Sequence, residues 1–313
     1  MTKYKVVVSD QVFPTVDIER GLLQDVDAEL QVATGGVDEV LEVAADADAI
    51  LNTYLPWSAD SIARLEKCRI IARYGIGFDN VDLAAAREAG IVVTNVPDYS
   101  VEEVATHALA LILAALRKVV AADQSVRAGE WTVDHFRPIH RLSTLTAGLV
   151  GYGRIARKIA APLEALGARI VAHDPYLQPG PEMPPLLSLD ELLGEADIVS
   201  LHLPLTDDTR GIIGEDALAG MRDGAILVNT SRGPLVDLDA LSAALTSGKL
   251  SAAALDVFDT EPVDPGRLEV IPNLIATPHM AYYSEEALQE SQRKAATQVI
   301  KVLTGEQPDY QVN

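Results

Sequence analysis

The sequence predicts an α/β fold made of two doubly wound parallel sheets. Short β-branched runs alternate with stretches of helical periodicity along nearly the whole chain, which is the pattern of parallel strands joined by helices that cover both faces of a sheet. A long apolar helical stretch from about residue 100, followed by the polar and aromatic loop 130–141, interrupts this alternation once. The chain has 313 residues, which is enough for two domains.

The strands predicted before the interruption are residues 5–9, 30–33, 49–52, 70–73 and 91–95. The helices predicted between them are residues 16–23, 37–44, 59–65 and 81–89. Ser100 and Glu103 then form a Ser-x-x-Glu pattern that predicts a capping box at the start of the long helix. Its apolar residues recur at helical spacing to about Ala122, so we expect one buried helix that passes from one domain to the other.

The strands predicted after the interruption are residues 146–150, 169–173, 198–202, 225–229, 252–257 and 274–276. A final helix is predicted from Ser284 to about Leu303. Ser284 is a suitable N-cap, and Glu285 and Glu286 suit the positive end of the helix dipole.

The composition excludes several functional classes. With 48% hydrophobic and 23% charged residues the chain is typical of a globular protein, and its formal net charge of −21 disfavours nucleic acid and anionic membrane partners. The only cysteine, Cys68, cannot form an intrachain disulfide. The N-terminus has no secretion signal, and no apolar stretch approaches the length of a membrane span. We therefore expect a cytoplasmic protein.

A dinucleotide-binding fingerprint follows the strand 146–150. Gly151 allows a tight turn, Gly153 allows a pyrophosphate to approach the backbone, and Ala156 allows close packing of the next helix. Arg154 and Ile155 begin this helix, whose N-terminus faces the phosphates. Alone, this fingerprint is weak evidence, because an ordinary turn can carry the same glycines.

The acid that completes the fingerprint is Asp174, 21 residues after Gly153. Its carboxylate can bind the adenosine ribose hydroxyls and repels a 2′-phosphate, so the predicted cofactor is NAD and not NADP. Pro162 lies inside the helix that follows the fingerprint and is expected to kink it.

Three segments carry a resemblance to a known family. The run 229–233 (NTSRG), the run 254–262 (ALDVFDTEP) and Thr277-Pro278-His279 resemble the D-isomer-specific 2-hydroxyacid dehydrogenases. The resemblance implies an NAD-dependent oxidoreductase that transfers a hydride between NAD(H) and a small D-2-hydroxy acid or 2-keto acid. It also implies two Rossmann-like domains with an active-site cleft between them: a discontinuous substrate domain, 1–99 plus 285–313, and an NAD-binding domain, 100–284.

The predicted catalytic residues are Arg232, Glu261 and His279. A 2-keto acid needs a cation for its carboxylate and carbonyl oxygen, and Arg232 offers a planar fork that stays charged. The alkoxide needs a proton donor, and His279 has a suitable pKa when a carboxylate such as Glu261 lies beside it. The alternatives are a surface ion pair for Arg232 and a packed structural role for His279.

The resemblance implies further contacts to the cofactor. Asp256 corresponds to an acid at the nicotinamide end, although a turn cap is the alternative. The remaining cofactor contacts that it implies are Leu203, Pro204, Thr209, Thr230, Arg232 and His279.

On the substrate side, the loop Tyr74-Gly75-Ile76-Gly77 resembles the one whose backbone N–H groups receive the substrate carboxylate, and the alternative is an ordinary turn. Tyr282 and Arg232 complete the predicted substrate contacts. The remaining histidines have no metal-ligand spacing, and no metal site is predicted; only His107 and His202 are candidates for lining the site.

Within the family, residues 279–286 and 77–80 look most like the C-terminal-binding-protein branch, which usually has Trp where this chain has Tyr282. That branch includes corepressors, so an NAD(H)-sensing binding protein is the alternative to an enzyme. The complete set of Arg232, Glu261 and His279, and the lack of a disordered tail, favour the enzyme.

Other enzymes of the superfamily are also alternatives. Formate dehydrogenases carry Gln in place of Glu261, and long phosphoglycerate dehydrogenases have a regulatory domain for which a chain ending at Asn313 has no room. A short phosphoglycerate or hydroxypyruvate/glyoxylate reductase remains open.

The family also implies a homodimer formed through the NAD-binding domain. We expect its surface at the helix after Ser100 and at the loop around Trp131 and Phe136. Domain closure is expected to use hinges near Tyr99 and Ser284.

Overall fold

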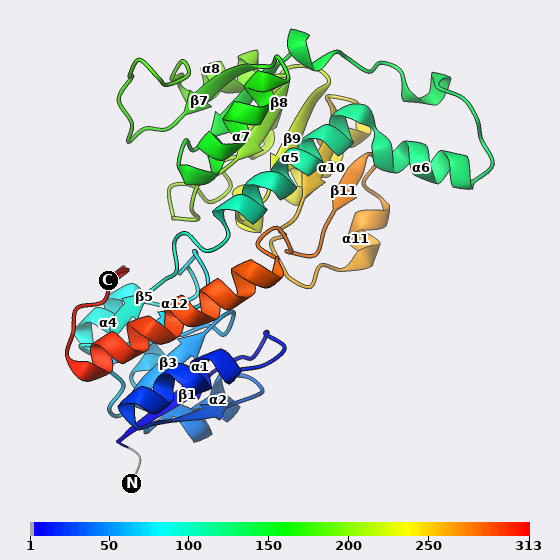
Figure 1. Ribbon diagram of the computed structural model, residues 1–313. Coiled ribbons are helices and arrows are strands. Elements are labelled where there is room, and N and C mark those ends of the chain that lie inside the picture. Colours follow the sequence, from blue (N-terminus) through cyan, green and yellow to red (C-terminus); the bar gives the residue numbers. More distant parts are fainter. Residues whose placement is uncertain (1–2) are drawn as a thin grey trace. The chain divides into compact units, whose positions relative to one another are not determined.

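The computed structural model describes residues 3–313, which form two compact units (Figure 1). The terminal unit comprises Met1–Ser100 and Ser284–Asn313, and the central unit comprises Val101–Tyr283. The first two residues of the predicted segment 1–99 lie outside the described range. Each unit contains its own parallel sheet, as the alternation of strands and helices predicted.

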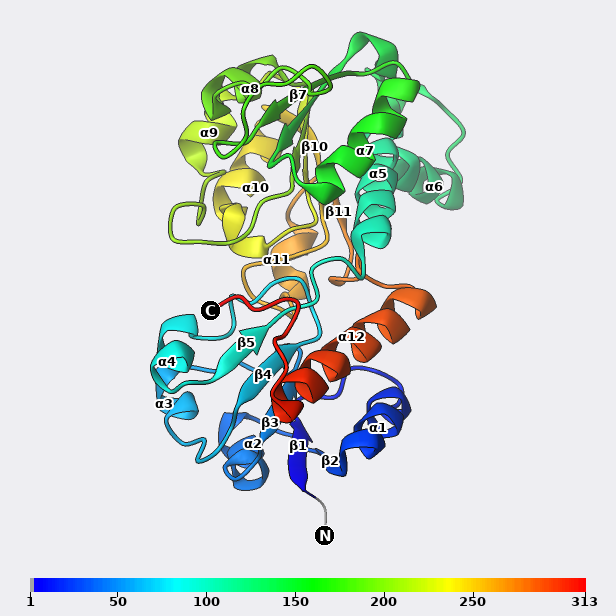
Figure 2. The same cartoon turned by 60° about the vertical axis from the view of Figure 1, so that its left-hand side comes forward.

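The terminal unit has a five-stranded sheet in the order β2-β1-β3-β4-β5, parallel throughout. Its strands are β1 (Tyr4–Val8), β2 (Ala28–Val32), β3 (Ala49–Asn52), β4 (Ile70–Arg73) and β5 (Val92–Thr94). Its helices are α1 (Asp17–Leu23), α2 (Val37–Ala44), α3 (Ala59–Ile62), α4 (Leu83–Glu88) and α12 (Glu285–Thr304), with the 3-10 turn η1 (Gln24–Val26). Figure 2 shows α1 and α12 on one side of this sheet and α3 and α4 on the other.

The central unit has a six-stranded parallel sheet in the order β11-β10-β9-β8-β6-β7. Its strands are β6 (Thr146–Val150), β7 (Arg169–His173), β8 (Ile198–Leu201), β9 (Ala225–Asn229), β10 (Leu250–Leu255) and β11 (Leu274–Ala276). Its helices are α5 (Val101–Arg117), α6 (Val119–Arg127), α7 (Arg154–Ala165), α8 (Leu189–Glu195), α9 (Glu215–Gly220), α10 (Leu238–Thr246) and α11 (Pro265–Glu269), with the 3-10 turns η2 (Asp134–Phe136), η3 (Leu142–Thr144) and η4 (Gly233–Leu235).

Two hydrophobic layers hold the central sheet. Helices α5 and α7 supply Leu111, Ile112 and Ile159 to the layer on one face, and α8, α9 and α10 supply residues such as Leu192 to the layer on the other. From β6 the chain passes to β7 on one side and then returns to β8 on the other. The order therefore reverses at β6, and in open α/β sheets ligands bind outside the carboxyl ends of the strands at such a point.

The long helix differs from its prediction. Instead of continuing to about Ala122, α5 ends at Arg117, because Lys118 adopts a left-handed conformation (φ 53°) and α6 leaves at an angle of 58°. No residue of α6 is buried, so no core contact favours a straight continuation. The predicted capping box is also wrong, since the buried Ser100 hydroxyl has no hydrogen-bond partner among residues 3–313.

The other elements follow the predictions closely. The predicted strands 49–52, 70–73, 146–150, 169–173, 225–229 and 274–276 have the observed bounds. The predicted strand 252–257 extends too far, because β10 ends at Leu255 and Asp256 is the first residue beyond it. Helix α7 runs through Pro162, and Ser284 caps α12 by accepting the N–H of Ala287 at 2.9 Å.

Within the described chain, no single helix has the length and apolar character needed to cross a membrane. Helices α5 and α6 meet those criteria only when they are taken together across their bend.

The packing of β6 against α8 gives a stability prediction. A Cβ added at Gly148 lies 2.6 Å from Leu192 Cδ2 and 2.8 Å from Ala196 Cβ, so Gly148→Ala should lower the free energy of unfolding by about 1–3 kcal/mol. Gly194→Ala, in α8 with nothing within 4 Å of the added atom, should raise it by about 0.5 kcal/mol. Urea denaturation of both variants checks this. Equal effects would contradict the packing argument.

Candidate functional site

The central sheet aligns the residues that follow its strands. The last paired residues are in register across all six strands: His173 with Val150, Val150 with Leu201, Leu201 with Asn229, Asn229 with Leu255, and Leu255 with Ala276. Four backbone hydrogen bonds, donated by Gly151, His202, Asp256 and Thr277, extend this ladder by one residue. The next residues therefore form one row along the carboxyl edge: Asp174, Gly151, His202, Thr230, Asp256 and Thr277. Asp174, Gly151, Thr230 and Asp256 are predicted site residues, and His202 directly precedes another, Leu203.

The glycine fingerprint has the backbone that a dinucleotide needs. Gly151 has φ 84°, and a Cβ added there would lie 2.5 Å from the carbonyl oxygen of His202. Gly153 is the N-cap of α7, has nothing within 4 Å of an added Cβ, and leaves the helix without a side-chain cap. Ala156 is fully buried in the packing of α7. The first turn of α7 can therefore offer its N–H groups and positive dipole end to a phosphate.

Asp174 follows β7 and shapes the same edge. Its carboxylate accepts the N–H of Tyr152 at 3.0 Å, through one oxygen, and the N–H of Tyr176 at 3.0 Å, through the other. It thus ties the glycine turn to the end of β7. Arg154 and Ile155, also predicted to contact the cofactor, occupy the first turn of α7.

The segment after β8 is closed on itself by Thr209. Its hydroxyl donates to the carbonyl of Pro204 at 2.7 Å and accepts the N–H of Thr206 at 2.8 Å. Leu203 packs against the core of the central unit. The predicted adenosine-binding residues of this segment therefore belong to one compact turn.

Two polar side chains of the row are buried without partners. Both ring nitrogens of His202 and the hydroxyl of Thr230 have no hydrogen-bond partner within residues 3–313. Burial lowers the pKa of His202 to about 3. His202 is therefore neutral at pH 7 and is not a proton donor of the kind that His279 can be.

Asn229, which the sequence analysis did not single out, shapes the loop of Arg232. Its side-chain amide donates to the Arg232 carbonyl at 2.8 Å, and its oxygen accepts the N–H of Ser231 at 2.9 Å. The Ser231 hydroxyl donates to the carbonyl of Leu201 at 2.7 Å. The next residue, Gly233, packs so closely on the backbone of Phe258 that an added Cβ would lie 1.9 Å from its carbonyl group.

His279 and Glu261 are in contact, as predicted. His279 Nδ1 lies 2.6 Å from Glu261 Oε2, and Glu261 Oε1 accepts the N–H of Phe258 at 2.8 Å. Partial burial acts to raise the pKa of Glu261, but the hydrogen bond and charge of His279, the Phe258 N–H and the charge of Arg232 together lower it. An ionised Glu261 accepts a proton-bearing Nδ1, so a reacting group is expected at the other ring nitrogen, Nε2.

Asp256 braces the loop that carries His279. Its side chain is 1% exposed; Oδ1 accepts from the Thr277 hydroxyl at 2.5 Å and from the N–H of Met280 at 3.0 Å, and Oδ2 accepts from the N–H of Ala281 at 2.8 Å. The Asp256 carbonyl accepts the N–H of His279 itself, whose φ is 51°. This is the turn-capping role that the sequence left open for Asp256.

The charge of Asp256 is stabilised despite its burial. Burial alone would raise the pKa of this carboxyl, but hydrogen bonds from His107, Thr277, Met280 and Ala281 lower it below its usual value. His107, from α5, lies 3.1 Å from the Thr277 hydroxyl and 3.5 Å from Asp256 Oδ1. The sequence indicated His107 only as a candidate for lining the site. Its partners, Asp256 and Thr277, lie about 150 residues away or more, so a single sequence could not identify them.

Tyr282 lies beside His279. The two rings are 6.2 Å apart between centroids and nearly perpendicular, at 79°. The central unit therefore brings together Arg232, Glu261, His279 and Tyr282 on loops that follow β9, β10 and β11.

The predicted carboxylate-binding loop lies in the terminal unit, directly after β4. Its three carbonyl groups are all bonded: Gly75 accepts from the Val96 N–H, Ile76 from the Asn95 side chain at 2.7 Å, and Gly77 from Arg73 Nε at 2.9 Å. The N–H groups of residues 75–77 have no partner in the described chain. Three adjacent unpaired donors are the arrangement that an anion requires.

Tyr74 was predicted to belong to this donor set, and the structure corrects this. Its N–H donates to the carbonyl of Asn52 at 2.9 Å, and its side chain is buried. Because the donors of Tyr74 are already used, the unpaired N–H groups of the predicted loop are those of Gly75, Ile76 and Gly77.

The row at the carboxyl edge and the glycine turn define a dinucleotide-binding unit, and comparison with known proteins agrees. Residues 109–281 match the family model described as "D-isomer specific 2-hydroxyacid dehydrogenase, NAD binding domain". The chain is 37% identical to the glyoxylate reductase of Aeropyrum pernix, over 100% of this chain and 97% of that protein. The D-lactate dehydrogenase of Aquifex aeolicus, crystallised with NAD and lactic acid, superposes with a TM-score of 0.87 at 30% identity, over 96% of each chain.

The chain belongs to the D-isomer specific 2-hydroxyacid dehydrogenase family, which confirms the resemblance found in the sequence. Its central unit contains the family's NAD-binding domain, so the predicted cofactor, NAD, is also confirmed. The chain is 39% identical to the D-3-phosphoglycerate dehydrogenase of Methanocaldococcus jannaschii over 99% of its own residues but spans only 59% of that protein. The closer likeness to the C-terminal-binding-protein branch stays a prediction.

The brace at Asp256 gives a pH-dependent stability prediction. In Asp256→Asn the amide NH2 replaces an acceptor, leaving at least one buried donor unpaired, so the free energy of unfolding at pH 7 should fall by about 1–3 kcal/mol. The pKa of Asp256 is lower in the folded than in the unfolded protein. The charged carboxylate therefore stabilises the fold above the unfolded pKa of about 3.9, and this stabilisation is lost as the pH falls through the folded pKa.

Urea unfolding of wild type and variant at pH 7 and in acid checks this, with Asp208→Asn in an exposed loop as the control. The difference in the free energy of unfolding between wild type and Asp256→Asn should become smaller in acid. A gap independent of pH would argue against a charged brace.

Proposed function

We propose that the protein is an NAD-dependent oxidoreductase that interconverts a small D-2-hydroxy acid and the corresponding 2-keto acid. The observation that carries the proposal is the contact of His279 with Glu261 on one edge of the sheet, where Arg232 and the glycine fingerprint also lie. A cation, an acid-base pair and a dinucleotide turn are the parts that this reaction needs.

In the reducing direction, Arg232 binds the substrate carboxylate and polarises the keto oxygen. NADH, when bound, supplies the hydride that reaches the keto carbon. His279 gives the proton on Nε2 to the keto oxygen, and Glu261 stabilises the imidazolium beforehand and holds the ring in place. In the oxidising direction His279 takes this proton back from the hydroxyl group.

The terminal unit supplies the second contact to the carboxylate. The N–H groups of Gly75, Ile76 and Gly77 receive it, and the small side chains at two of these positions allow it to approach the backbone. We accordingly propose that the segments 1–99 and 285–313 form the substrate domain and that 100–284 forms the NAD-binding domain. Tyr282 contacts the substrate beside His279.

The cofactor contacts follow the row along the sheet edge. Gly151, Gly153 and the first turn of α7, with Arg154 and Ile155, hold the pyrophosphate. Asp174 binds the adenosine ribose and excludes a 2′-phosphate. The other contacts we propose are Leu203, Pro204 and Thr209 to the adenosine, and Thr230, Arg232, Asp256 and His279 toward the nicotinamide.

A reductase of a short keto acid, such as glyoxylate or hydroxypyruvate, and a phosphoglycerate dehydrogenase are both candidate activities, since relatives of these kinds are 37%, 36% and 39% identical to the chain. An NAD(H)-sensing binding protein is the second candidate. It requires no acid-base pair, so the contact between Glu261 and His279 favours the enzyme.

The deciding experiment is NADH oxidation with a panel of 2-keto acids, from glyoxylate, hydroxypyruvate and pyruvate to phosphohydroxypyruvate. His279→Ala should lower kcat by about a hundredfold to ten-thousandfold, because the proton donor is lost, with NADH affinity largely kept. Arg232→Ala should lower kcat and raise KM for the keto acid. NADH fluorescence titration measures the cofactor affinity.

Arg222→Ala, on the surface of the central unit, is the matched control and should behave as wild type. An active His279→Ala enzyme would refute the acid-base assignment. NADH binding without turnover of any keto acid would favour the sensor.

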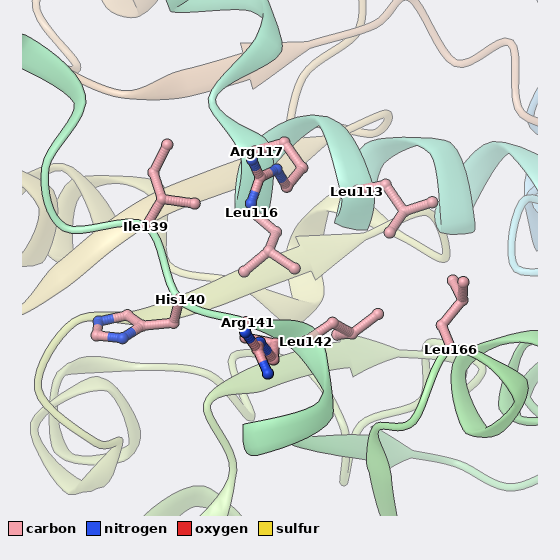
Figure 3. A pocket seen from close by; sticks show the side chains of 8 residues that line it. All are labelled: Leu113, Leu116, Arg117, Ile139, His140, Arg141, Leu142 and Leu166. Atoms are coloured by element: carbon pink, nitrogen blue, oxygen red, sulfur yellow. The ribbon is translucent and has the colours of Figure 1, made fainter. Parts of the chain in front are cut away.

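We further propose a homodimer formed through the central unit. A groove of about 480 Å³ lies between α5 and the segment before β6 (Figure 3). It is lined by Leu113, Leu116, Arg117, Ile139, His140, Arg141, Leu142 and Leu166. Close by in the sequence, Val119, Val126, Trp131 and Val133 are exposed, Trp131 to 90%. An apolar surface of this extent in a strongly acidic chain fits a second copy.

The dimer can be tested at Trp131. Trp131→Ser should shift the molar mass measured by light scattering from dimer toward monomer, because an aromatic anchor is removed from the surface. Tyr176→Ser, at a residue that is 89% exposed elsewhere in the central unit, is the matched control. A monomeric wild type would refute the dimer.

The cytoplasm is the compartment we propose. Cys68 is the only cysteine and is buried, and burial raises its pKa to about 12. Such a thiol forms no disulfide, which suits a reducing compartment.

A further inference from the structure

Tyr74 is held at three of its groups by the rest of the terminal unit. Its N–H donates to Asn52, and its carbonyl accepts from the Ser291 hydroxyl at 2.5 Å. Its phenol donates to Glu19 Oε1 at 2.8 Å, and its ring packs edge-on against Phe13 at 4.7 Å between centroids. Main chain and side chain are thus both fixed at the residue where β4 passes into the carboxylate-binding loop.

Glu19 is an unusual partner for this phenol. Its side chain, on α1, is completely buried, and within residues 3–313 it takes part in no ion pair. It accepts hydrogen bonds from the Tyr74 phenol and from the Gln292 amide, at 3.1 and 3.0 Å to its two oxygens. A buried carboxylate is costly unless its hydrogen bonds are made. Tyr74 and Gln292 therefore supply the hydrogen bonds that offset the cost of burying this side chain.

Adjacent residues of α12 complete the arrangement. Ser291 bonds the carbonyl of Tyr74, while Gln292 bonds Glu19 and also donates to the carbonyl of Thr15 at 2.8 Å. Ser291 and Gln292 are both buried. Helices α1 and α12, which are more than 250 residues apart in the sequence, thus meet at one tyrosine.

The position of that tyrosine matters for the loop that follows it. Gly75 and Gly77 have no side chains with which to anchor the backbone, so a free loop would sample many directions for its N–H groups. Fixing Tyr74 at one end, together with the bond from Arg73 Nε to the Gly77 carbonyl at the other, prepares these donors for an anion. A loop that is already ordered loses less conformational entropy when it binds the anion.

We propose that Glu19, Ser291 and Gln292 are positioning residues for the substrate carboxylate, acting through Tyr74 on the N–H groups of residues 75–77. This inference rests on the proposed function of that loop. It assigns a role in substrate affinity to residues on two helices that do not touch the substrate.

The test uses Tyr74→Phe, which removes only the phenol oxygen. We expect KM for the best keto acid of the panel to rise about tenfold, as for the loss of one buried hydrogen bond. The value of kcat should stay within about twofold, because the proton donor is untouched, and NADH affinity should be unchanged. Glu19→Gln, which keeps an acceptor oxygen, should give a smaller rise.

The matched control is Tyr4→Phe. The Tyr4 phenol is buried in the same unit and donates to the carbonyl of Leu303, also on α12, at 2.8 Å. The two variants should lose similar stability, but Tyr4→Phe should leave KM unchanged. If both raise KM equally, or neither does, the positioning role is refuted.

Amide hydrogen exchange gives a second measurement that does not depend on turnover. The Val96 N–H, which donates to the Gly75 carbonyl, should exchange faster in Tyr74→Phe than in Tyr4→Phe, and equal rates would refute the inference. If instead the wild type turns over no keto acid and glyoxylate does not slow exchange of the N–H groups of residues 75–77, the proposed function fails, while the difference between the variants still decides whether Tyr74 anchors the loop.

Discussion

The carboxylate of Asp256 is the group on which the loops at the carboxyl edge of the central sheet depend. It joins the end of β10 to the loop after β11, and this loop carries His279 in a left-handed conformation that the loop must maintain. His279 in turn contacts Glu261, whose other oxygen holds the Phe258 N–H. The backbone of Phe258 packs on Gly233, beside Arg232. These contacts thus lead from a buried carboxylate to the backbone beside Arg232.

Acidic side chains perform the same structural task elsewhere in this acidic chain. Asp10, after β1, accepts the N–H groups of Thr53, Tyr54 and Leu55, which follow β3. Asp174 likewise ties the glycine turn to the end of β7. Since parallel strands bring their carboxyl ends to one edge, a carboxylate there can collect backbone donors from the loops of its neighbours. Part of the net charge of −21 is therefore used to shape loops.

Local sequence patterns predicted the helices and strands well, but they could not predict contacts between residues that are distant in the sequence. Strand β9 ends at Asn229 as expected, because the β-branched run stops there. The break at Lys118 could not be foreseen, since Val119 and Val120 continue an apolar pattern and only the missing core contact distinguishes them. The contact of Glu261 with His279 was foreseen from family motifs. The pairing of Tyr74 with Glu19, 55 residues apart, has no signal in a single sequence.

The two-part construction of the terminal unit constrains the order in which the chain can fold during synthesis. The central unit is one continuous segment, so all its strands are available once residue 283 has been made. The packing of the terminal unit cannot be completed before α12 is made, because contacts such as Tyr4 with Leu303 span 299 positions. Until then the face that α12 covers, with Glu19 beside it, stays open to water and to other nascent chains. We therefore expect the central unit to complete its fold first and the terminal unit to complete its packing last, although its first strands are synthesised earliest.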